Sequence, residues 1–354
     1  MNNKVFGIFI CILLMTSYIT LAGNNEKTST VSMLNNLSDE SFDTDLPVWE
    51  ENDYWIYKVD TLSVDFEQGG QYIHVLLETD ELKLEVLEVN TETYTVKIDA
   101  TLNGNGQLFM NSKNGPINMT LNLTNTKLTG TIIFNKSDLG IKELNPKLDG
   151  RLSIDITEQH FVDFKIPKIS FRATIDIFSD IATPLTFIDF PLDVNSTWGV
   201  PGTNISIDGT IRSPWLRVFN FVNNLLRLNW NLTFRILEKL NITVDQEMII
   251  NVSDILHDVL PIINISHVLN DYLNISNCFE IQEIPSIFLC NNTENITVQG
   301  KTYNAYNISV IEGIGSIYYA EEAGNIIKIS GLFKDIIPFI SNLNIELKET
   351  NYQR

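Results

Sequence analysis

The sequence predicts a mainly β fold of the β-rich α+β class, in which a large antiparallel curved sheet or half-barrel carries a helical insert at about residues 213–275. Three observations predict it. Apolar and polar residues alternate with period two in many short segments, which is typical of half-buried strands. Polar turns rich in Asn, Gly and Pro separate these segments. One long stretch breaks the alternation and has apolar residues at helical spacing instead.

The first 22 residues have the pattern of a secretory signal peptide. Lys4 precedes an uncharged apolar run from Val5 to Ala22, which ends in small residues before a polar stretch. We expect cleavage after Ala22. The alternative is an uncleaved anchor, because the run is about as long as the shortest membrane spans, and membrane contact is expected only through this segment. Residues 23–46 are polar and aperiodic, which indicates a linker.

The charge of the chain excludes one class of partner. It has 24 Lys and Arg against 44 Asp and Glu, a net charge of −20 that becomes −21 once the signal segment and Lys4 are removed. Such a chain repels phosphate backbones, so we expect no nucleic-acid partner. Together with the signal segment, the charge favours a soluble extracellular or cell-surface protein.

The body of the chain, residues 47–354, has the pattern of one β-rich extracellular domain, or of two units divided near residue 185. The predicted strands are 54–59, 93–99, 117–123, 152–157, 161–178, 205–211, 230–236, 242–252, 303–311 and 326–332. The predicted turns are Gly69-Gly70, Asn103 to Gly106, Asn114 to Pro116 and Pro201-Gly202. Many strands joined by short polar turns favour a large antiparallel sheet or a partly closed barrel.

The predicted insert begins at Ser213-Pro214, a capping hydroxyl followed by Pro at the first helical position. Two further helices are expected at 254–260 and 266–273. An apolar stripe of this kind packs against a sheet in most proteins. The alternative is that the stripe lines a cavity for an apolar ligand or touches a membrane surface. The candidate ligand-binding residues on it are Trp215, Phe219, Phe221 and Val222.

Cys278 and Cys290 are the two cysteines that remain after signal cleavage. A hairpin centred on Ile284 would place them opposite each other, within reach of a disulfide. Such a bond would close a short loop and add about 3 kcal/mol of stability on the chain-entropy model. Export favours this bond. The alternatives are two thiols or a metal pair, but the sequence offers no further ligands at suitable spacing.

Asn-x-Ser/Thr triplets are over-represented. With 39 Asn, 22 Ser and 29 Thr in 354 residues, chance gives about five or six such triplets. The chain holds 14. The sequon asparagines are Asn36, Asn118, Asn122, Asn135, Asn195, Asn204, Asn231, Asn241, Asn251, Asn264, Asn274, Asn291, Asn295 and Asn307. Compositional drift explains many Asn but not the hydroxyl two residues later, so we expect a glycoprotein.

The sequence offers no specific catalytic or metal-binding pattern. Its four histidines are His74, His160, His257 and His267, and none belongs to a metal-binding or nucleophile motif. Carboxylates are so frequent that no single pair points to acid–base catalysis. We therefore expect no catalytic residue, no cofactor and no metal, and a protein that is not an enzyme.

Four short motifs resemble secreted archaeal surface proteins of unknown function. Residues 48–57 resemble the opening W-x-x-G-D-x-W-x-Y of these proteins, with Asn52 where they have Gly. Residues 296–306, 317–328 (Y-Y-x-x-E-x-G-N-I-x-K) and 190–198 resemble three later elements. Such proteins are distantly similar to the half-barrels of bacterial lipoprotein carriers, whose concave sheet holds acyl chains. The resemblance implies an apolar or lipid-like ligand.

Three functions follow as hypotheses. The first is a non-catalytic secreted or cell-surface glycoprotein that binds an apolar ligand in a curved sheet. The second is a structural or adhesive component of the cell envelope with no small-molecule ligand. The third is a hydrolase with a site dispersed among carboxylates. A deep apolar concavity would favour the first, and a filled core would favour the second.

Overall fold

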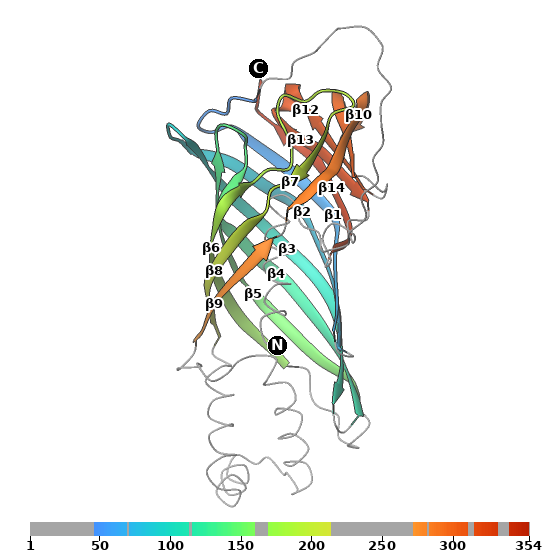
Figure 1. Ribbon diagram of the computed structural model, residues 1–354. Helices are drawn as coiled ribbons and strands as arrows, with labels where there is room; N and C mark the ends of the chain where they lie inside the picture. Colours follow the sequence, from blue (N-terminus) through green and yellow to red (C-terminus); the bar gives the residue numbers. More distant parts are fainter. Residues whose placement is uncertain are drawn as a thin grey trace, which may run out of the picture.

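The structure is a computed structural model that describes residues 46–68, 71–112, 115–159, 169–213, 272–281, 283–310, 315–331 and 340–353. These residues form one 14-stranded sheet in which every pair of neighbours is antiparallel. The sheet is strongly curved and does not close on itself (Figure 1). The predicted mainly β architecture with a large curved antiparallel sheet is therefore confirmed.

Several strands are longer than the sequence pattern predicts. They are β1 (Tyr54–Gln68), β2 (Gln71–Val89), β3 (Thr93–Ser112), β4 (Gly115–Asn135), β5 (Ile141–Gln159), β6 (Ile169–Leu185), β7 (Thr197–Val200), β8 (Thr203–Arg212), β9 (Tyr272–Ile281), β10 (Ile284–Val298), β11 (Lys301–Val310), β12 (Gly315–Ala320), β13 (Asn325–Gly331) and β14 (Ile340–Thr350). Among the described residues the one helical element is the 3₁₀ turn η2 (Glu321–Ala323). None of them lies in a helix long and apolar enough to span a membrane.

The strand order shows how the sheet curls. It runs β7-β10-β11-β12-β13-β14-β1-β2-β3-β4-β5-β6-β8-β9, so β7 and β9 are the two edge strands. In the chain, however, β7 leads directly into β8, and β9 leads directly into β10. Each of these short connections joins one side of the sheet to the other. The curvature must therefore bring the two edges close together, although they do not pair.

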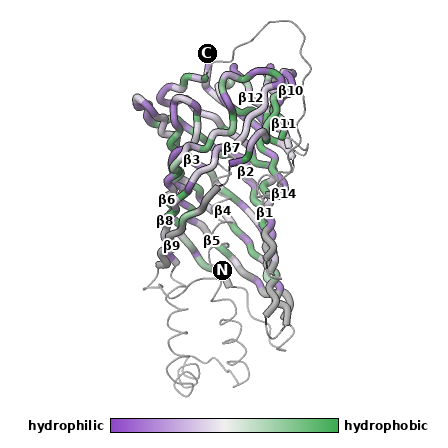
Figure 2. The backbone as a smooth tube through the Cα atoms, viewed as in Figure 1, coloured by the Kyte–Doolittle hydropathy of each residue, from purple (hydrophilic) through white to green (hydrophobic). Residues whose placement is uncertain are grey.

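Side chains alternate between two faces of the sheet as strand geometry requires. On the inner face, one row across β2–β6 is apolar, and it consists of Leu82, Ala100, Leu128, Leu148 and Ile175. One residue further along, the outer row is polar, and it consists of Lys83, Asp99, Thr129, Lys147 and Asp176. Figure 2 shows the resulting alternation of hydrophobic and hydrophilic positions along the strands. Burial of the apolar rows on one side therefore fixes the register.

The inner face of the sheet has two regions. The upper half is the part of the wall near β10–β14, and the lower half is the part that extends away from these strands (Figure 1). The upper inner face is Leu82, Ile98, Leu128, Leu148 and Ile175, all buried. The lower inner face is Met119, Leu121, Leu123, Leu152 and Phe171, all half-buried. Leu148 and Leu152 lie four positions apart on β5 and face the same side.

One predicted turn is wrong. Asn103 to Gly106 lies inside β3 and pairs on both sides. The glycines there serve close packing instead of chain reversal. A Cβ atom added to Gly104 would lie 2.5 Å from Leu77 Cδ2 and 2.7 Å from the Leu76 carbonyl oxygen. The neighbouring strand therefore occupies the space that a side chain would need.

The predicted helical insert is only partly tested. Residues 214–271, with the helices expected at 254–260 and most of 266–273 and the strands expected at 230–236 and 242–252, lie outside the described residues. The far boundary of the insert is wrong, because β9 begins at Tyr272 and pairs with β8. Residues 272–275 are therefore strand. Residues on both sides of position 185 belong to the same sheet.

Candidate functional site

Aromatic side chains fill the upper half of the curved sheet. Trp49, which precedes β1, lies at the centre of the group. Its ring centroid is 5.0 Å from that of Trp55, 5.1 Å from that of Tyr94 and 5.3 Å from that of Phe134. All four side chains are at most 2% exposed. Aromatic pairs at these distances add to the apolar burial, so this end of the molecule is a packed core.

Hydrogen bonds tie this core to the turn between β12 and β13. The indole Nε1 of Trp49 donates to the Gly324 carbonyl oxygen at 3.0 Å, and that of Trp55 donates to the Ala323 carbonyl oxygen at 2.6 Å. Gly324 has φ +58°, and a Cβ atom there would lie 2.4 Å from the ring of Tyr352. Glycine is therefore required on both conformational and packing grounds. The indole N–H groups of both tryptophans are buried and hydrogen-bonded, so packing in this core leaves neither donor without a partner.

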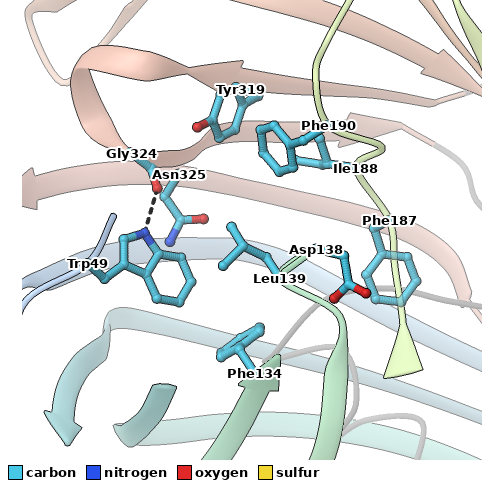
Figure 3. Close-up of a pocket in the computed structure, with 10 residues that line it drawn as sticks. All are labelled: Trp49, Phe134, Asp138, Leu139, Phe187, Ile188, Phe190, Tyr319, Gly324 and Asn325. Atoms are coloured by element: carbon cyan, nitrogen blue, oxygen red, sulfur yellow. Dashed lines mark hydrogen bonds between the residues drawn. The ribbon is translucent and has the colours of Figure 1, made fainter. Parts of the chain in front are cut away.

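A small pocket opens beside Trp49 (Figure 3). Segments far apart in the sequence line it, namely the β4–β5 turn with Asp138 and Leu139, the loop after β6 with Phe187 and Phe190, and Tyr319 of β12. Its free volume of about 30 Å³ has room for about two water molecules. An acyl chain does not fit such a space.

The carboxylate in this pocket is part of the turn. Asp138 Oδ1 accepts hydrogen bonds from the Gly140 backbone N–H at 2.8 Å and from Asn135 Nδ2 at 3.1 Å. The other nine lining residues include no second carboxyl group, no imidazole and no amine, and the one other titratable side chain among them is the phenol of Tyr319.

The lower inner face differs from the upper one. It continues the same apolar rows, with Leu123 opposite Leu152 and Leu152 opposite Phe171. These side chains, and Met119 and Leu121 beside them on β4, are half-buried. Apolar side chains that stay partly accessible in a contiguous group mark surfaces that bind other apolar groups. This face is the candidate functional site.

A polar cluster lies on the outer face of β1 and β2. His74 Nδ1 is hydrogen-bonded to Asp65 Oδ1, and the Tyr72 hydroxyl donates to the same oxygen at 3.0 Å. Burial raises the pKa of Asp65, but hydrogen bonds with Ser341, His74 and Tyr72 outweigh it and hold the pKa below its ordinary value. The serine contacts the carboxylate and not the imidazole. The cluster therefore lacks the nucleophile–base contact of a hydrolase.

The structure does not bring the predicted ligand-binding residues into view. Trp215, Phe219, Phe221 and Val222 lie outside the described residues, as do His160, His257 and His267. No group of three or more His, Cys, Asp or Glu side chains in the described part of the chain is arranged to hold a metal ion. The expectation that the protein uses neither a metal nor catalysis stays a prediction.

The hairpin predicted to place Cys278 opposite Cys290 is wrong, and the disulfide that it would allow is not formed in this structure. Cys278 and Cys290 are not bonded to each other. The strands that carry them do not pair, because β9 pairs with β8 while β10 lies between β7 and β11. Cys278 is exposed on the edge strand, and Cys290 is fully buried. Burial raises the pKa of the Cys290 thiol to about 11, with a further contribution from Asp193.

The described sequons fall into two groups. Asn195, Asn204, Asn291 and Asn295 are exposed, whereas Asn118, Asn122, Asn135 and Asn307 are half-buried. Asn274 lies in β9 opposite Thr210. Asn36, Asn231, Asn241, Asn251 and Asn264 lie outside the described residues. The structure thus separates exposed from half-buried sequons. The Asn-x-Ser/Thr pattern alone cannot make this distinction.

Sequence reasoning missed the lower inner face as a site. The alternation in 117–123 and 152–157 correctly predicts strands, but it says nothing about which apolar rows are fully buried and which are half-buried. The roles of Trp49 and Trp55 were also missed, although their aromatic content predicts core positions. No protein-family profile matches the chain, and neither does any curated protein or solved structure.

Proposed function

We propose that this chain is a non-catalytic, exported surface glycoprotein that holds an apolar, lipid-like ligand against the lower inner face of its curved sheet. The observation that carries the proposal is the change in burial along one face. Leu148 is 3% exposed, whereas Leu152, on the same strand and the same face, is half-buried. A ligand that covered Leu152 and its neighbours would extend the apolar core from the upper to the lower half of the inner face.

The shape and chemistry of the face favour an unbranched apolar ligand. The rows cross β4, β5 and β6 without interruption, and neighbouring strands lie about 4.8 Å apart. The rows that pair Leu121 with Ile154 and Leu123 with Leu152 contain no charged residue. Charges gather on the opposite face, as in the ion pairs Arg172–Asp149 and Lys147–Asp176. The sequence motifs that resemble secreted archaeal proteins point to the same ligand class.

Export is supported by the signal pattern and the excess of sequons. The orientation of one sequon within a strand, Asn204, agrees with glycosylation of an exported protein. Asn204 lies between the buried Thr203 and Ile205 on β8, so its exposed side chain is on the outer face. A sugar at that position would extend into solvent. The ligand and the glycans would therefore occupy opposite faces of the same sheet.

A structural or adhesive envelope component remains the second candidate, because the upper half is a filled core. The pocket beside Trp49 holds about 30 Å³, and the aromatic side chains around it are buried. This candidate predicts that the lower inner face carries no ligand in the mature protein.

Native mass spectrometry of the full secreted chain tests the proposal. We expect a co-purified adduct of lipid mass, lost when the protein is denatured. In a titration with a fluorescent acyl probe, Leu152→Asp should abolish binding because it places a charge in the apolar face. Gln107→Asp on the outer face of β3 is the matched control and should bind as the wild type does. Leu152→Ala, which keeps the face apolar, should fold and bind more weakly. Absence of any adduct, together with equal probe binding by the first two variants, would favour the structural role.

A further inference from the structure

Strand β7 forms one edge of the sheet. This four-residue strand ends the sheet and pairs with β10 only, through Val200 with Ile284, Trp198 with Phe288 and Thr197 with Leu289. In the described part of the chain no strand pairs with its other side. Such edges are templates for pairing with other chains, and natural proteins cover or block them.

Two sequons lie side by side at the start of this edge. The Asn195 backbone N–H donates to the Cys290 carbonyl oxygen at 2.6 Å, and the Cys290 N–H donates to the Ser196 carbonyl oxygen at 3.0 Å. These bonds hold Asn195 next to Asn291. Both asparagines are exposed, and so are Thr197 and Thr293, whose hydroxyls complete the two sequons. The atoms that a glycosyl-transferring enzyme recognises are therefore accessible at both positions.

In two other sequons the side-chain amide of the asparagine forms hydrogen bonds within the fold. Asn307 Nδ2 donates to Glu294 Oε1 at 2.6 Å, and Asn307 Oδ1 is buried without a hydrogen-bond partner. Asn135 Nδ2 donates to Ser137 Oγ at 2.8 Å and to Asp138. Modification at either position would disrupt these contacts. The comparison separates sequons that the fold leaves accessible from sequons that it uses structurally.

We propose that Asn195 and Asn291 carry N-linked glycans that together cover the β7 edge and prevent pairing between copies of the chain. The proposal rests on the export inferred above. Nδ2 of each asparagine forms a bond to the anomeric carbon of an oligosaccharide and loses a proton. The bond from that carbon to the phosphate oxygen of a lipid-linked donor breaks, and the lipid phosphate leaves with the electron pair. Two hydrated sugar chains then occupy the solvent beside a strand about 13 Å long.

Glycopeptide mass spectrometry and light scattering on the full chain secreted by a eukaryotic host test this proposal. We expect glycans at Asn195, Asn291 and Asn204, and none at Asn307. The double variant Asn195→Gln, Asn291→Gln should show about a twofold rise in mass with concentration, as expected for a symmetric dimer. Asn204→Gln is the control. It removes a sugar from β8, which has strand partners on both sides, and it should behave as the wild type does.

Each contrary result has a distinct meaning. Unmodified Asn195 and Asn291 in a protein glycosylated at Asn204 would overturn the assignment of these two sites. Occupied sites combined with an unchanged mass of the double variant would overturn the edge-covering role. If the double variant is not secreted, enzymatic trimming of the folded glycoprotein gives the same readout. A chain with no glycan at any sequon would overturn this proposal and the glycoprotein part of the proposed function, while leaving ligand binding to be tested by its own experiment.

Discussion

The upper and lower halves of the inner face are both apolar but differ in burial. They share strands β4–β6, but Trp49, Trp55 and strands β10–β14 cover the upper half, while Leu121, Leu152 and Phe171 below stay half-buried. The difference arises from strand length. β2–β6 are 17 to 21 residues long, whereas β11–β14 are 6 to 11. The long strands therefore extend beyond the part of the sheet that closes the core.

The largest difference between the halves should come from aromatic truncation. Trp55→Ala removes a fully buried ring and the hydrogen bond to Ala323, and we expect it to lower the free energy of unfolding by about 3–5 kcal/mol. Phe171→Ala in the lower half should cost less than half as much, because the ring is already partly in water. Chemical denaturation followed by fluorescence measures both. Equal losses would show that the lower half is as tightly packed as the upper.

A matched pair on β5 makes the comparison at constant chemistry. Leu148→Ala should destabilise the protein by about 2–5 kcal/mol. Leu152→Ala should destabilise the apo protein by about 1 kcal/mol, because its side chain buries less apolar surface. Urea titrations of both variants, before and after addition of an acyl probe, give the two values. If a ligand covers Leu152, the probe should stabilise the wild type more than Leu152→Ala.

The reactivity of the two cysteines should differ between the core and the sheet edge. The pKa of the Cys290 thiol is about 11, so about one thiol in a thousand is ionised at pH 8, and the side chain is buried as well. We expect an alkylating agent to label Cys278 on the exposed edge at least about 100-fold faster than Cys290 in the native protein. Peptide mapping after timed labelling gives the rates. Recovery of a Cys278–Cys290 disulfide from purified protein would contradict the strand order at this edge.

The smallest effect is expected from pH at the outer cluster of the lower half. Because the pKa of Asp65 is lowered in the folded state, its ionised form stabilises the protein above the ordinary carboxyl pKa of 3.8. This contribution is lost as the pH falls through the folded-state value. The difference in stability between the wild type and Asp65→Asn should therefore shrink as the pH falls below about 4. A difference that grows as the pH falls below about 4 would contradict the hydrogen bonds assigned to this carboxylate.

The architecture was accessible from sequence because period-two alternation is a local property. Segments such as 93–99 and 117–123 show it clearly, and the structure has strands there. Strand ends were less accessible. The glycines of 103–106 have the composition of a turn, but they serve contact with Leu76 and Leu77 on the neighbouring strand. Only the pairing partner distinguishes these two uses of glycine.

The candidate site could not be predicted for a related reason. Whether Leu152 is covered depends on how far β10–β14 extend along β1–β6, which is a property of the whole sheet. The hairpin predicted between the two cysteines was wrong on similar grounds. A local hairpin between Cys278 and Cys290 is plausible by spacing, but the curvature of the sheet sends β9 and β10 to different neighbours. Non-local pairing therefore overrides local hairpin formation here.

Ligand binding at the lower inner face is best tested by anomalous X-ray scattering from a brominated acyl chain bound to crystals of the full secreted protein. We expect bromine positions along this face, within contact distance of Leu121, Leu152 or Phe171. Leu152→Asp crystals treated in the same way should lose these positions, and Gln107→Asp crystals should keep them. Bromine sites confined to the outer face, or an acyl chain that leaves the lower inner face empty at saturating concentration, would contradict this expectation.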